Sequence, residues 1–122
     1  MCQDFGVENE IIPRIASGFG GGIGNTGATC GAVVGAVMAI GLIKEQCKSL
    51  EDWMRLADIV KEFRRRFEAE MKTISCRELT GIDLANENEM EQLMNSDIPV
   101  TVCIPAVGLA YKLVMDLLKE TP

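Results

Sequence analysis

The chain has 122 residues, a formal net charge of −6 and a pI near 4.6. That length predicts one domain with a core of ordinary size, and an acidic chain is poorly suited to non-specific binding of nucleic acid or anionic membranes. The chain contains no histidine, which excludes Cys-His and Ser-His catalysis, histidine metal ligation and covalent haem c attachment. Five cysteines without a C-x-x-C pair or a signal peptide predict a reduced, cytoplasmic protein.

Residues 7–16 predict a short helix that carries Ile11, Ile12 and Ile15 on one side. A folded domain rarely begins this close to its first helix, so we expect an element upstream of the glycine-rich part to be missing. Residues 1–122 are therefore expected to form a single redox-type helical domain that is truncated at its N-terminus.

A glycine-rich loop follows at residues 18–27. Glycine this dense is tolerated mainly where the backbone takes a positive φ or approaches another group closely. The loop has the spacing of a dinucleotide-binding fingerprint, but no strand pattern precedes it and no βαβ unit surrounds it. Binding of an anion or a nucleotide phosphate by the loop and the next helix N-terminus stays an alternative. The glycines that would contribute are Gly20, Gly21, Gly22, Gly24 and Gly27.

Residues 30–44 predict the central helix. Thr29 is a good N-cap, which would make Cys30 the first helical residue, where free amides and the helix dipole lower the pKa of a thiol. The uniformly apolar part, 30–43, is short for a membrane span of about 20 residues, so we expect a buried helix and no membrane insertion. Small residues on this helix allow another backbone to pack closely: Gly31, Ala32, Gly35, Ala36 and Ala39.

Ser49 is expected to begin the most regular helix of the chain. Apolar residues recur there at three- and four-residue spacing, which predicts one buried stripe over about six turns. The stripe consists of Trp53, Leu56, Val60, Phe63, Phe67 and Met71. The three arginines at 64–66 are expected to form a solvated face that complements the helix dipole.

A second cysteine falls at a predicted helix start. Residues 75–78 have the Ser-x-x-Glu pattern of a capping box. Cys76 would then begin a short helix that ends at Gly81. Residues 82–98 are acidic and rich in asparagine, and they predict a short surface helix between two loops.

The last helix is predicted within residues 99–120, with Pro105 in its first turn. Cys103 would then lie at or just before the N-terminus of that helix. The predicted buried face consists of Leu109, Leu113, Leu117 and Leu118, with Val114 beside it. Together these elements predict an all-α fold, a compact helical bundle in which a glycine-rich loop leads into a central small-residue helix.

Three cysteines share one predicted setting, because Cys30, Cys76 and Cys103 each fall at a helix start. Helix N-termini favour thiolates, and thiolates act both as metal ligands and as redox nucleophiles. Cys2 and Cys47 have no such setting. Spacing along the chain does not by itself define a site for the three.

Four segments, in this order, resemble the C_GCAxxG_C_C family of prokaryotic redox-active proteins, which is named for four cysteines and a Cys-Gly-Ala-x-x-Gly motif. The segments are residues 15–24, 29–36, 76–79 and the cysteine at 103 before an apolar helix. The resemblance implies that Cys30, Cys76 and Cys103 are three of the family cysteines. The fourth would precede the glycine loop by several helical turns, and Cys2 is too close to the loop to match it comfortably.

The leading interpretation is a redox-active protein that uses these thiolates for thiol/disulfide chemistry or to ligate an iron–sulfur or other metal centre. Cys30 would be the most exposed and reactive thiol, with Cys76 and Cys103 as resolving partners or co-ligands. Such an oxidoreductase or electron-transfer protein would need a redox partner protein. Two alternatives stay open: an anion-binding module, and an interaction protein that forms a homodimer through the small-residue face of residues 30–44.

Overall fold

The computed structural model describes residues 6–7, 9–44 and 46–121. Within these ranges the regular structure is helical, and the β-type pairing is one isolated antiparallel bridge between Thr29 and Ser75. The predicted all-α fold is therefore confirmed. In chain order the elements are α1 (Ile11–Ala16), α2 (Gly20–Ile23), α3 (Gly31–Ile43), α4 (Leu50–Met71), α5 (Cys76–Thr80), α6 (Glu87–Met94), η2 (Pro99–Cys103) and α7 (Ile104–Glu120).

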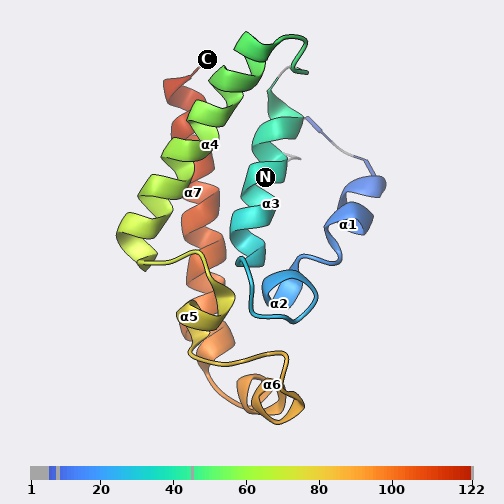
Figure 1. Ribbon diagram of the computed structural model, residues 1–122, viewed down its shortest axis with the longest axis vertical. Helices are drawn as coiled ribbons and strands as arrows, with labels where there is room; N and C mark the ends of the chain where they lie inside the picture. The colour runs from blue at the N-terminus through green and yellow to red at the C-terminus, as the bar shows by residue number, and fades with distance from the viewer. Residues whose placement is uncertain (1–5, 8, 45, 122) are drawn as a thin grey trace.

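Three long helices, α3, α4 and α7, form the body of the molecule (Figure 1). Helix α7 packs against both of the others, and α1 lies to one side of the bundle. Phe63 and Phe67 of α4 are fully buried between the helices, with ring centroids 6.1 Å apart. The other buried core residues come from α3 and α7: Val33, Ala36, Ile40, Ala106, Ala110, Leu113, Val114 and Leu117.

Helix α4 begins where the sequence predicts it. The Ser49 hydroxyl accepts a hydrogen bond from the Asp52 amide, as an N-cap does. The predicted stripe is buried through its middle, but Trp53 is 57% exposed. Trp53 belongs to the first turns of α4, which lie at one end of the bundle (Figure 1). The prediction that Trp53 is buried is therefore wrong.

The arginines of α4 lie on a solvated face, as predicted, and pair with carboxylates. Arg65 and Arg66 both bind Glu62, at 2.6 and 2.9 Å. Arg66 also reaches Glu120 on α7, at 2.9 Å. These hydrogen bonds lower the pKa of Glu62 to about 2.

The last α-helix, α7, begins at Ile104 with Pro105 in its first turn, as predicted. A π-helical turn that was not predicted, η2, precedes it directly, and in η2 the Ile104 amide donates to the Pro99 carbonyl. Pro99 occupies the start, where the missing N–H is tolerated. Pro105 lies further along the helix. It has no N–H to donate to the carbonyl four residues back, and a widened turn is found at this place. Cys103 is the residue just before α7, as predicted, and it is also the last residue of η2, which precedes α7 without a break.

A second, smaller core lies below the bundle, around α5 and α6. It is formed by Cys76, Ile82, Leu84 and Leu93, all less than 9% exposed. Residues 82–98 thus cover one side of α5, a role that their acidic, polar composition does not indicate.

One helix of the described part, Pro99–Glu120, is long and apolar enough by length and composition alone to cross a membrane. The core helix of a folded domain passes the same test. Here five residues of α7 are buried: Ala106, Ala110, Leu113, Val114 and Leu117. The predicted absence of membrane insertion stays a prediction.

Candidate functional site

The candidate site lies where the segment before α3 pairs with the segment before α5. The Cys30 amide donates to the Ile74 carbonyl, and the Cys76 amide donates to the Ala28 carbonyl, both at 2.7 Å. Between these two bonds lies the bridge that joins Thr29 and Ser75. Two cysteines that are far apart in the sequence are thereby held at the two ends of one short ribbon.

The ribbon places both thiols on one side. Side chains alternate along an extended segment, so Cys30 and Cys76 point away from the side that carries Thr29 and Ser75. Cys76 is the diagonal neighbour of Cys30, for which antiparallel geometry gives a Cα separation of about 7–8 Å. A disulfide requires about 4.4–6.8 Å, so the diagonal separation exceeds the disulfide range by at most about 1 Å.

Cys30 is the N-cap of α3, one position before the predicted place, and it is half-buried against the main core. Thr29 does not cap the helix because its backbone belongs to the bridge with Ser75. The Cys30 carbonyl accepts from the amides of Val33 and Val34. Helix geometry leaves the amides before these two without a carbonyl partner in α3, and the Cys30 side chain accepts no capping hydrogen bond from the helix.

Cys76 is the first residue of α5 and is only 8% exposed. Burial raises the pKa of the Cys76 thiol above its ordinary value of 9.0, and negative charge on Cys30 or Cys103 raises it further. The predicted thiolate stabilisation at this helix start is therefore wrong. Helix α5 has only five residues, so its dipole is weak and the loss of solvation dominates.

Cys103 joins the same site from the other side of α5. It is half-buried in η2, which packs against α5. Burial raises the pKa of Cys103, and a charge on Cys30 adds to this rise. The three predicted cysteines thus come within electrostatic reach of one another, and Cys103 differs from the other two because a π-helical turn precedes it.

The glycine-rich loop packs on Cys76. A Cβ atom on Gly22 would lie 2.7 Å from the Cys76 Cβ and 2.6 Å from the Ala28 amide nitrogen, so only glycine fits there. The φ angles are positive at Gly21, Gly22, Ile23, Gly24 and Asn25, which makes this part of the loop a left-handed turn. A β-branched residue such as Ile23, at φ 62°, is strained in this region.

The amides of this loop are largely paired within it. Gly24 donates to the Gly18 carbonyl at 2.9 Å, and Gly27 donates to the Gly21 carbonyl at 3.1 Å. Asn25 donates to the Gly20 carbonyl at 3.3 Å. An anion would have to compete with these carbonyls, so the geometry lends no support to the phosphate-binding alternative.

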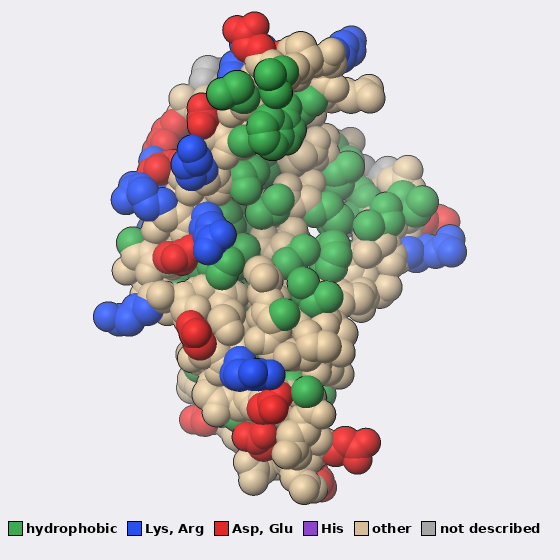
Figure 2. Space-filling view, in the orientation of Figure 1, with side chains coloured by type: hydrophobic (Ala, Val, Ile, Leu, Met, Phe, Trp, Pro, Cys, Tyr) green, Lys and Arg blue, Asp and Glu red, His purple; other side chains and the backbone are tan. Residues whose placement is uncertain are grey.

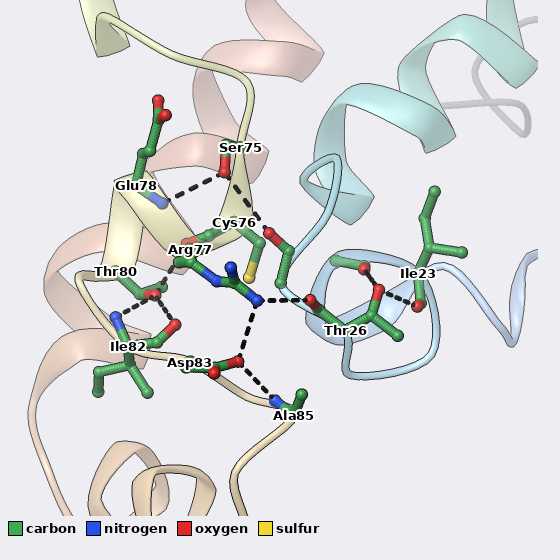
Figure 3. Close-up of polar contacts among 12 residues, drawn as sticks. Ile23, Thr26, Ser75, Cys76, Arg77, Glu78, Thr80, Ile82, Asp83 and Ala85 are labelled. Atoms are coloured by element: carbon green, nitrogen blue, oxygen red, sulfur yellow. Dashed lines mark hydrogen bonds and ion pairs between the residues drawn. The ribbon is translucent and has the colours of Figure 1, made fainter.

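Arg77, next to Cys76, ties the glycine loop to the segment after α5 (Figure 3). Its guanidinium donates to the Thr26 carbonyl at 3.4 Å and to Asp83 at 3.1 Å. The sequence pattern singled out the neighbouring capping box but not this link. The capping box is half present: the Ser75 hydroxyl accepts from the Glu78 amide at 3.3 Å, whereas the Glu78 carboxylate binds the Thr73 hydroxyl.

The described cysteines, aspartates and glutamates do not fit a metal centre as they are placed. No three of them converge on a point from which they could hold an ion. The metal interpretation of Cys30, Cys76 and Cys103 stays a prediction. Cys47 lies past the C-terminal end of α3, about 20 Å along the helix from Cys30, and Cys2 lies outside the described residues.

Comparison with known proteins assigns the chain to one family. A search of curated proteins and a search of solved structures each found no significant match. The profile of one family, described as "putative redox-active protein (C_GCAxxG_C_C)", matches residues 1–117, which is nearly the whole chain. The motif that names the family includes Cys30 and Gly31, at the junction where the backbone before α3 pairs with the backbone before α5. The chain therefore belongs to the C_GCAxxG_C_C family.

Proposed function

We propose that this protein is a thiol–disulfide redox protein in which Cys30 and Cys76 form the reacting pair. The observation that supports this most directly is the pair of 2.7 Å backbone hydrogen bonds that joins the Cys30 segment to the Cys76 segment. They hold the two thiols on one side of a ribbon, close to the separation that a disulfide needs. Cys103 lies within electrostatic reach and serves as a second resolving thiol.

Cys30 is the attacking thiol in this proposal. It is half-buried rather than fully buried, and it lies at the N-terminal end of a 13-residue helix. Cys76 is less accessible and its pKa is raised by burial, so it is protonated at neutral pH and suits the resolving role.

The substrate would be a disulfide, either of a small thiol compound or of a partner protein. The Cys30 thiolate attacks one sulfur of that disulfide, a mixed disulfide forms, and the other sulfur leaves as a thiolate and takes up a proton. Cys76 then loses its proton, and its thiolate attacks Cys30 Sγ and expels the second sulfur. Two electrons and two protons pass from the protein dithiol to the substrate, which becomes two thiols. The reverse sequence reduces the protein.

The test starts from the fully reduced protein and adds oxidised glutathione as the disulfide. Disulfides are then mapped by mass spectrometry after acid quenching. We expect a Cys30–Cys76 bond in the wild type. A Cys76→Ser, Cys103→Ser double variant, which lacks both resolving thiols, should accumulate glutathione on Cys30, and Cys30→Ser should lose rapid glutathionylation. Cys47→Ser is the matched control, because Cys47 lies far from the site, and it should behave as the wild type.

Two results would contradict the proposal. One is glutathionylation of Cys76 before Cys30, and the other is a dominant bond from Cys30 to Cys103. Metal analysis of anaerobically purified protein tests the separate metal prediction. Stoichiometric iron or zinc that is lost in Cys30→Ser would favour a metal centre over the dithiol reaction.

A further inference from the structure

Helix α3 is apolar on all sides, but the protomer covers only part of it. The buried side carries Val33, Ala36 and Ile40. With 100° per residue, the opposite side is formed by Val34, Gly35, Met38, Gly41 and Leu42. Leu42 is 43% exposed, and Val34 and Met38 are only partly covered. A helix that is apolar all round is normally enclosed by other elements, so this outer side lacks a full cover among the residues that the structure describes.

The uncovered side of α3 belongs to a larger apolar face. Figure 2 shows hydrophobic side chains gathered over the start of α4, along α3 and over α1, with a hollow between α1 and α3. The large exposed side chains of these elements are Ile11, Ile15, Leu42, Leu50, Trp53 and Met54. We call this set, together with the outer side of α3, the α1–α3–α4 face.

The area of the face matches that of a protein–protein interface. The exposed fractions of the six large side chains correspond to roughly 700 Å² of apolar surface. A standard interface buries about 800 Å² on each partner, and the largest apolar patch of an ordinary monomer is about 300–600 Å². The other exposed apolar stripe, Val100, Ile104 and Val107, corresponds to roughly 300 Å² and falls within the ordinary range.

Two glycines of α3 support a close helix–helix contact. A Cβ on Gly35 or Gly41 would meet nothing within 4 Å in the protomer. Glycine is unfavourable inside a helix relative to alanine, and at these two positions the protomer gains no packing in return. A second helix backbone approaching this side would use the space that the missing side chains leave.

We propose that the α1–α3–α4 face binds a second copy of this chain, with the two α3 helices crossing at a two-fold axis. The chain carries a net charge of −6, so two copies repel each other over most of their surface, yet no charged residue occurs from Ile15 to Ile43. The α3 part of the face is therefore a place where two copies meet without like charges. An isologous contact also supplies each α3 with the glycine-lined partner that it needs.

The experiment is sedimentation equilibrium of the full chain with excess reductant, from low micromolar to several hundred micromolar concentration. The reductant excludes disulfide-linked dimers. We expect a reversible dimer. Leu42→Glu would place a charge in the contact and should raise the dimer Kd at least about 100-fold. Ile104→Glu is the matched control on the other apolar stripe and should leave the Kd within about threefold.

A second variant and a second signal separate dimer loss from misfolding. Gly41→Ala should weaken the dimer, whereas in a lone protomer it would only raise the unfolding midpoint. The emission of Trp53, the single tryptophan, should shift to shorter wavelength as the dimer forms. A wild type that stays monomeric throughout, equal effects of Leu42→Glu and Ile104→Glu, or association only with lipid vesicles would overturn the proposal.

Discussion

Replacing Gly22 by alanine tests the role of the glycine loop against Cys76. The new Cβ would lie 2.6–2.8 Å from the Ala28 nitrogen, the Cys76 Cβ and the Gly27 carbonyl carbon, closer than such atoms approach in proteins. The φ of +70° is also unfavourable for alanine. The left-handed conformation costs about 1–2 kcal/mol and the forced displacement about 1–3 kcal/mol. The free energy of unfolding should therefore fall by about 2–5 kcal/mol.

Gly24→Ala is the matched control for this prediction. Gly24 has nearly the same φ, +67°, but a Cβ there would meet nothing within 4 Å. Its loss should be only about 1–2 kcal/mol. Urea unfolding followed by far-UV circular dichroism measures both variants, and the alkylation rate of Cys76 in the native state reports on the loop. If Gly22→Ala and Gly24→Ala lower the stability equally, the loop does not depend on its contact with Cys76.

Three further predictions follow from strain and titration. Ile23→Gly should be more stable in urea than Ile23→Ala by about 1 kcal/mol, because φ is positive at residue 23. At an ordinary helical position alanine is the more stable of the two, and that order here would show that the backbone at residue 23 is not strained. Burial raises the pKa of the Cys76 thiol, so the rate of Cys76 alkylation in native protein should reach its midpoint above pH 9.0. Mass spectrometry at a series of pH values measures this, and a midpoint below 9.0 would show that the thiol is solvated. The hydrogen bonds from Arg65 and Arg66 lower the pKa of Glu62 from 4.5 to about 2. The stability that this pairing contributes is therefore present above pH 4.5 and is lost as the pH falls toward 2. The urea midpoint should fall less steeply across this range in an Arg65→Gln, Arg66→Gln double variant, and an unchanged slope would rule out the pairing as the cause.

Features that depend on neighbouring residues could be predicted from the sequence. The N-cap at Ser49 and the stop at Gly81, where φ is +72°, both follow from local backbone chemistry. The candidate thiols Cys30 and Cys76 were also identifiable, because each falls next to a helix start. The pattern did not reveal that the two lie on one ribbon.

Features that depend on distant contacts could not be predicted. Thr29 looks like an N-cap, but its pairing with Ser75 moves the cap to Cys30. Trp53 continues an apolar stripe, yet it is 57% exposed. The raised pKa of Cys76 depends on side chains such as Leu93, which cover it from a segment that reads as polar surface. In each case the tertiary partner, rather than the local pattern, decides the outcome.

The bridge between Thr29 and Ser75 also has a consequence for the whole bundle. A bond from Cys30 to Cys76 would close a loop of roughly 45 residues that contains all of α3 and α4. Closing a loop of that size lowers the entropy of the unfolded chain enough to add about 4 kcal/mol to stability. By linkage, the folded state favours the oxidised form by the same amount. The melting temperature of the protein would then follow the redox potential of its surroundings, so that one measurement reports on both.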